Sequence, residues 1–198
     1  MKKARLLGKM LILFVLLDHS RSYAQLRPET LRFSVANETT SLPSFRLLKL
    51  PVHPAFNVGA DFRVKSGKHW QKSLGADVYY YYHRLAEHAI MLDASYRLGY
   101  RFNFGLQINL LTALGYKHTI LPGDKYELKD GEYQKARHFG KPMANVKVGL
   151  GLEYPLSEKY SVTTDYKVML AAPSGNIYIP FALNNFFGAG LKIKLENN

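Results

Sequence analysis

The chain has 198 residues, 47% of them hydrophobic and 13% aromatic, and it carries 27 lysines and arginines against 15 aspartates and glutamates. This length suits one domain, and every long stretch is too polar for a polytopic helical membrane protein. The absence of cysteine excludes disulfides, a cysteine-ligated metal and a lipidated N-terminal cysteine.

Residues 1–24 have the pattern of a secretory signal peptide. A basic start precedes an eight-residue apolar run from Met10 to Leu17, and Ser22 and Ala24 occupy the small-residue positions before a cleavage site. A membrane-spanning helix needs about 20 apolar residues, so we expect export rather than anchoring. Cleavage would leave a net charge of +8 on 25–198. An exported basic chain meets anionic membrane surfaces, and we expect no nucleic-acid partner.

From Leu31 onward, apolar residues recur at every second position, which is the period of β-strands with one apolar face. Between Phe56 and Val64, for example, each even position is apolar and each odd position is polar or glycine. The sequence predicts eight strands and no long amphipathic helix. The predicted strands are 31–35, 56–64, 70–84, 88–101, 105–120, 144–154, 160–171 and 187–195.

The predicted connections divide into two groups. Short polar turns fall at 66–69, 102–104 and 155–159, whereas the links at 37–54, 121–143 and 172–185 are longer. If neighbouring strands are antiparallel, the long links and a brief turn at 85–87 lie at one end of a barrel, and the short turns lie at the other. Short inner turns, longer outer loops and an even number of strands are typical of transmembrane barrels.

Glycines and charges indicate that the polar face points into a narrow lumen. An eight-stranded barrel has room inside only for side chains, so small residues must make space for large ones. Charges of both signs in such a space are expected to pair. The predicted strand glycines on the polar face are Gly59, Gly75, Gly99, Gly105, Gly115, Gly149, Gly151, Gly188 and Gly190. The candidates for lumen ion pairs are Asp61, Arg63, Asp77, Asp93, Arg97, Lys147, Glu153, Asp165, Lys167 and Lys192.

Aromatic residues of the apolar face gather toward the strand ends, as in the interfacial girdles of membrane barrels. Phe56, Tyr80 and Tyr116 are expected near the outer rim, and Trp70 and Tyr154 near the inner rim. We therefore predict an all-β fold over 25–198, an eight-stranded antiparallel up-and-down transmembrane β-barrel. The alternative is a soluble secreted barrel with its apolar face inside.

The chain resembles small eight-stranded bacterial outer-membrane β-barrels of the outer membrane protein A and X types, through its signal peptide, strand parity and turn arrangement. The segments 50–59, 81–84 and 99–101 are similar to a family of small outer-membrane barrels. This resemblance implies an outer-membrane location and contact with outer-membrane lipid and lipopolysaccharide. It also implies insertion by the barrel-assembly machinery with periplasmic chaperones, and a monomer. It implies no activity and no cofactor.

The histidines and serines of the sequence lead us to predict no catalysis. Some small outer-membrane barrels hydrolyse lipid A with a serine, a histidine and an acid near the outer rim. His83, His88 and His118 fall at outer strand ends, yet no serine lies close to any of them on a shared face. By parity, His88 and His118 face lipid while His83 faces inward. The lipid A hydrolase remains the alternative to a structural or surface-interaction role.

Neither metal nor phosphate binding has a clear motif. His53, His83 and His138 could converge through their loops, but they lack a metal-ligand spacing, and we predict no metal site. The predicted loop 121–143 mixes charges with aromatic residues that could contact a partner or lipopolysaccharide. The candidates for loop binding are Arg46, Lys49, Arg84, Lys125, Lys129, Lys135, Arg137 and Lys141.

Overall fold

The computed structural model describes residues 27–40, 50–84, 87–123, 125–129, 131–136, 139–174 and 180–195, without the side chains of Arg63, Lys125 and Ala136. The predicted signal peptide and the predicted loop residues Arg46, Lys49, Arg137 and His138 lie outside these residues. No helix in the described ranges is long and apolar enough to span a membrane.

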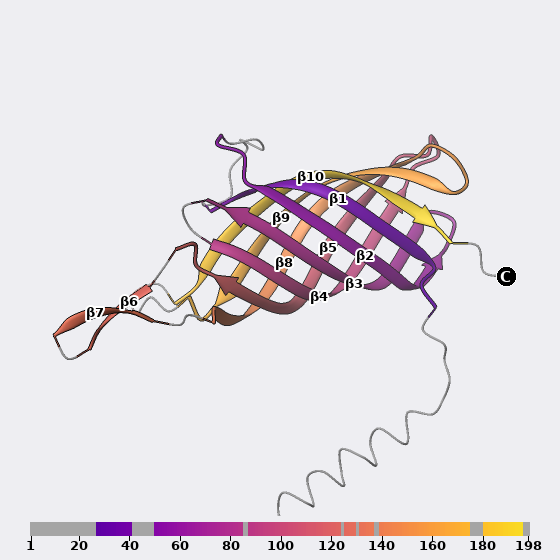
Figure 1. The fold of residues 1–198 in the computed structure, drawn as a ribbon. Coiled ribbons are helices and arrows are strands. Elements are labelled where there is room, and N and C mark those ends of the chain that lie inside the picture. Colours follow the sequence, from indigo (N-terminus) through magenta and orange to yellow (C-terminus); the bar gives the residue numbers. More distant parts are fainter. Residues whose placement is uncertain are drawn as a thin grey trace, which may run out of the picture.

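Eight long strands close into a barrel and two short ones form a separate hairpin (Figure 1). The barrel strands are β1 (Thr30–Thr39), β2 (Pro54–Ser66), β3 (Trp70–His83), β4 (Glu87–Arg101), β5 (Gln107–Ile120), β8 (Lys141–Pro155), β9 (Tyr160–Ala172) and β10 (Ala182–Lys194). Each pairs with its neighbours in an antiparallel manner, and β1 closes the barrel between β10 and β2. The predicted fold class is confirmed.

The two ends of the barrel differ as predicted. Thr30 and Lys194 pair at the end that also carries the short turns, and we call this the inner end. The longer links leave the opposite, outer end. The hairpin of β6 (Lys125–Lys129) and β7 (Glu132–Ala136) projects from the outer end in Figure 1. Sequence alternation predicted no strand here, because each hairpin strand is only five residues long.

The apolar face of the barrel points outward. Leu92 and Leu114, near the middle of β4 and β5, expose 59% and 63% of their surface, while Asp77 and Asp93 are buried. Aliphatic residues cover the middle of the outer surface, and exposed aromatic residues lie toward both rims. The exposed rim aromatics include Phe56, Tyr80 and Tyr116 at the outer end and Trp70, Tyr154 and Tyr160 at the inner end. Exposing a continuous apolar surface of this size to water is energetically unfavourable. Such a surface is typical of the lipid-facing wall of a transmembrane barrel.

The strands depart from the prediction in their boundaries and in one bulge. Strand β1 continues to Thr39 and β10 begins at Ala182, so both are longer than their alternating cores. Gly105 lies in the turn before β5, with φ of +97°, and is not a strand residue. The pairing of β2 with β3 shifts between Asp61 and Arg63. The predicted alternation of β2 ends at this bulge. Val64 was predicted on the apolar face, but it pairs with the buried Ser73 and lines the cavity at the inner end of the lumen.

The lumen is not filled by charged groups alone. Its outer half contains a buried cluster in which the Tyr81 and Phe186 rings meet edge to face, with centroids 5.7 Å apart. Met91 and Met169 are also buried in this cluster. The predicted ion-paired interior therefore shares the lumen with an apolar layer. Large uncharged side chains fill the space between charged layers and need no counter-ion there.

Candidate functional site

At the centre of the lumen, one arginine lies between two carboxylates and forms an ion pair with each. Arg32 on β1 donates to both oxygens of Asp77 at 2.9 and 3.2 Å, and its Nη2 lies 3.0 Å from Asp61. Asp61 also accepts a hydrogen bond from Thr30 at 2.6 Å. Arg32 was not among the predicted site residues, although it lies on the polar face of the first predicted strand. Alternation alone could have identified it.

The other predicted lumen residues lie as follows. Lys147 is paired with Asp93, which also accepts a hydrogen bond from Asn145 at 2.9 Å. The remaining ion pairs join Lys167 to Asp165 at 2.7 Å and Lys192 to Glu153 at 3.1 Å. Arg97 forms no ion pair with another described residue, and its buried Nε lacks a hydrogen-bond partner there. The side chain of Arg63 lies outside the described part, and its backbone follows the bulge in β2.

The ion pairs of Arg32, Lys147 and Lys167 occupy the middle of the lumen, and the pair of Lys192 and Glu153 lies nearer the inner end. The Lys147 Nζ lies 3.7 Å from the centroid of the Tyr79 ring, which joins the charged layer to the apolar cluster. A cavity with a volume of about 360 Å³ lies at the inner end, beside Glu153 and Lys192. The arrangement therefore suits a plugged barrel rather than an open pore.

At the outer mouth, three strand ends place Glu38, His53 and His83 in one lateral row. The pairing of β1 with β2 ends at Asn37 and Pro54, and one more step sets Glu38 opposite His53. The Glu38 amide donates to the His53 carbonyl at 2.8 Å, which extends the pairing. The pairing of Ala55 with Tyr81, continued by two steps, sets His53 opposite His83. Directly opposed residues share a face of a sheet, so all three side chains point into the mouth.

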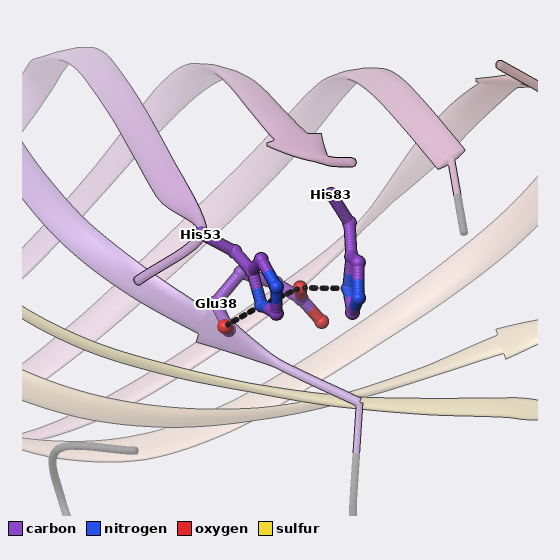
Figure 2. Close-up of side chains that lie close together, drawn as sticks. All are labelled: Glu38, His53 and His83. Carbon is purple, nitrogen blue, oxygen red and sulfur yellow. Dashed lines mark hydrogen bonds and ion pairs between the residues drawn. The ribbon is translucent and has the colours of Figure 1, made fainter. Parts of the chain in front are cut away.

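Figure 2 shows how the two imidazoles meet the carboxylate. The Nδ1 of His83 lies 3.1 Å from Glu38 Oε2, and the Nδ1 of His53 lies 3.9 Å from the same oxygen. The two rings stack with centroids 3.5 Å apart. Glu38 is fully buried, whereas the side chains of His53 and His83 are 14% and 16% exposed. One ligand atom from each residue lies within 4.8 Å of the others, so these residues could hold a metal ion.

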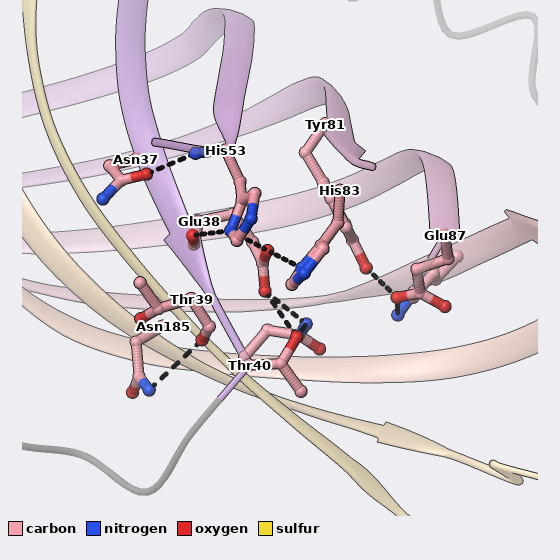
Figure 3. A network of polar contacts seen from close by, with 11 residues as sticks. Asn37, Glu38, Thr39, Thr40, His53, Tyr81, His83, Glu87 and Asn185 are labelled. Atoms are coloured by element: carbon pink, nitrogen blue, oxygen red, sulfur yellow. Dashed lines mark hydrogen bonds and ion pairs between the residues drawn. The ribbon is translucent and has the colours of Figure 1, made fainter. Parts of the chain in front are cut away.

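Neighbouring groups fix this cluster (Figure 3). Glu38 Oε1 accepts hydrogen bonds from Asn184 at 2.7 Å and Thr40 at 3.0 Å, which leaves Oε2 toward the histidines. The Asn37 side chain accepts a hydrogen bond from the His53 amide at 2.7 Å.

A second carboxylate lies beside this cluster. The Glu87 carboxylate accepts a hydrogen bond from the Tyr81 hydroxyl and another from the Lys117 ammonium, the latter at 2.5 Å. Neither Glu38 nor Glu87 was predicted as a site residue, because both lie at or beyond the ends of the predicted strands.

The other rim histidines lie where parity placed them, on the outer face. His88 contacts Tyr80 at 3.1 Å, and His118 contacts Tyr116 at 3.0 Å. In the described ranges, no serine hydroxyl is hydrogen-bonded to a histidine ring. The serine–histidine pair of the hydrolase alternative therefore has no geometric support in these ranges.

Those loop-binding candidates that the structure describes lie on separate elements. Lys129 and Lys135 are exposed on the β6–β7 hairpin, and Arg84 is exposed at the end of β3. Lys141, at the start of β8, donates to the Ser174 carbonyl at 3.3 Å. The backbone of Lys125 belongs to β6, while Arg46, Lys49 and Arg137 are outside the described ranges.

The closed antiparallel barrel has an apolar outer surface and an ion-paired interior. These two features define the class of small transmembrane β-barrel proteins. No protein-family model matches the chain, and no curated protein matches it.

Several solved structures are similar to this fold. Neisserial surface protein A has 12% identity and a TM-score of 0.48, over 84% of this chain and 95% of its own. The N-terminal β-barrel domain of Pseudomonas aeruginosa OprF has 10% identity and a TM-score of 0.46, over 85% and 98%. The outer membrane enzyme PagL has 10% identity and a TM-score of 0.49, over 84% and 99%. The class of this protein follows from its own topology and outer surface.

Proposed function

We propose that this chain is an integral protein of the bacterial outer membrane with a non-catalytic, surface-interaction role. The observation that carries the proposal is the exposed aliphatic band between two aromatic rims, which needs a lipid environment. The predicted signal peptide supports export to that membrane. A plugged lumen argues against transport, and it leaves the outer surface as the part that meets partners.

The β6–β7 hairpin is the best candidate for that interaction. Its pairing places Tyr126 opposite Lys135 and Leu128 opposite Tyr133, so these four side chains share one face. Tyr126, Leu128 and Tyr133 are all exposed. Because the outer end of an outer-membrane barrel meets the leaflet that lipopolysaccharide forms, we propose lipopolysaccharide as the ligand of this face. Its tyrosines would contact sugars, and Lys135 would lie near phosphates.

Two experiments test this function. Membrane fractions are first run on a denaturing gel with and without boiling. A boiling-dependent shift of a band recovered only from outer membranes is expected, whereas an unshifted band in the periplasmic fraction would overturn the location. Deletion of 124–140 should then abolish binding of the refolded protein to lipopolysaccharide while preserving the gel shift. Persistent binding in the deletion variant would overturn the role of the hairpin.

The non-catalytic part of the proposal is tested on lipid A. Mass spectra of lipid A from cells that overproduce the intact protein should match those from cells with an empty vector. A loss of acyl chains that depends on His83 would instead favour the hydrolase.

A further inference from the structure

We propose that Glu38, His53 and His83 bind one divalent transition-metal cation of the Zn²⁺ class at the outer mouth of the barrel. Two imidazoles and one carboxylate form a donor set that suits Zn²⁺ and related cations, and it is used at zinc sites with an open position. The three donor atoms come from the adjacent ends of β1, β2 and β3, within 4.8 Å of one another. This proposal is independent of the hairpin and its ligand.

The distances suit one shared cation. In a tetrahedral zinc site with ligand bonds of about 2.0–2.2 Å, donor atoms lie about 3.3–3.6 Å apart. The Nδ1 of His83 and Oε2 of Glu38 are separated by 3.1 Å, and the Nδ1 of His53 and Oε2 by 3.9 Å. One donor atom from each residue thus lies within 4.8 Å of the others. The His53 Nδ1 also lies 3.2 Å from the Glu38 main-chain carbonyl oxygen, so the imidazole rings must rotate for all three residues to bind one cation.

Charge provides a separate argument. Every other carboxylate in the described barrel strands forms an ion pair with a lysine or arginine: Asp61, Asp77, Glu87, Asp93, Glu153 and Asp165. Glu38 is the most deeply buried of the set together with Asp61, and its ion-pair partners in the described ranges are the two histidines alone. A buried carboxylate without a cation is costly. A bound divalent cation would supply the missing positive charge.

The surroundings of Glu38 are those of a positioned ligand. Asn184 and Thr40 hold Oε1, so the carboxylate is oriented with Oε2 toward the imidazoles. Such outer-shell hydrogen bonds orient metal ligands and raise metal affinity. His53 and His83 are partly exposed at the mouth, which provides access from the outer side. Three protein ligands leave one tetrahedral position for water or another small ligand.

The test uses the intact protein without a polyhistidine tag, refolded in detergent and stripped of metal with a chelator. Co²⁺ serves as the spectroscopic probe and Zn²⁺ as its competitor. We expect one cation per chain, visible Co²⁺ absorption typical of low coordination number, displacement by Zn²⁺, and no displacement by Mg²⁺ or Ca²⁺.

Matched variants then assign the ligands. E38Q and the double variant H53N/H83N should weaken Co²⁺ binding by about 100-fold or more, and N184A by about 10- to 100-fold. The control H88N/H118N removes two rim histidines from the outer face and should leave binding unchanged.

Three results would overturn the proposal: no binding by the wild type, unchanged binding in H53N/H83N, or binding lost only on deletion of 124–140. The boiling-dependent gel shift verifies that each variant is folded. If the ligand variants do not fold, X-ray absorption of the zinc-loaded wild type decides. Two imidazole nitrogens in the metal shell support the site, and an oxygen-only shell overturns it.

Discussion

The imidazole of His53 stacks on that of His83, with centroids 3.5 Å apart and an angle of 20° between the planes. Adjacent strands lie about 4.8 Å apart, so residues opposite each other at two strand ends are naturally placed for such a contact. Glu38 extends the row to a third strand and accepts hydrogen bonds from three sides. A cation bound to this row would connect the ends of β1, β2 and β3.

Zn²⁺ is therefore expected to stabilise the folded barrel. At a free concentration of 100 times its Kd, a cation that binds only the folded state adds about 2.7 kcal/mol to the free energy of unfolding. The measurement is urea unfolding followed by the fluorescence of Trp70, the single tryptophan. The gain should be absent in E38Q and retained in H88N/H118N. An equal gain in E38Q would show that the stabilising cation binds elsewhere.

Replacing Arg32 with methionine should destabilise the barrel severely. The change leaves Asp61 and Asp77 buried without their shared cation, and breaking a buried ion pair in this way costs about 3–5 kcal/mol. Urea unfolding of R32M measures the loss. R101M is the control, because Arg101 is exposed at the inner end and a surface substitution changes stability by about 0.5 kcal/mol or less. Similar losses in both variants would contradict the central role of Arg32.

An arginine on the outer surface should be costly in proportion to its depth in the membrane. Val148 lies midway along β8, and its side chain is exposed on the aliphatic band. V148R is expected to lower the free energy of unfolding in lipid vesicles by about 2–4 kcal/mol, and Y154R, at the inner rim, by about 0–1 kcal/mol. Equal effects at both positions would mean that the band does not span the hydrocarbon core.

Gly115 should not tolerate a larger residue. A Cβ atom there would lie 2.1 Å from Asp93 Oδ1 and 2.3 Å from the Leu92 carbonyl oxygen, so backbone would have to move. We expect G115A to cost about 1–3 kcal/mol through overpacking. G67A provides the comparison, since its Cβ would meet only the Trp70 carbonyl oxygen at 3.5 Å. Urea unfolding of both variants under the same conditions tests this, and equal stability would contradict the close packing around Gly115.

The alternation of residue types predicted the strands and their two faces, while glycines, charges of both signs and rim aromatics predicted which face points to lipid. A strand has a side-chain period of two, so the polar positions of Asp77, Asp93 and Lys147 could be assigned to one face without knowing their neighbours. The lumen of a small barrel then requires charges to pair. Parity could not choose the partners, because each lumen position faces several strands. The ion pairs of Arg32 with Asp61 and Asp77 depend on how the closed barrel places β1, β2 and β3.

By itself, the sequence determined the strands and their two faces through local periodicity. Its glycines, charges and rim aromatics then indicated the lipid-facing surface and the inward direction of His83. Tertiary structure decided the rest of the outer mouth. Glu38 and His53 lie beyond the alternating cores of their strands, where pairing with neighbours rather than side-chain pattern extends the sheet. The row of Glu38, His53 and His83 is a product of register between three strands, and register is set by closure of the whole barrel.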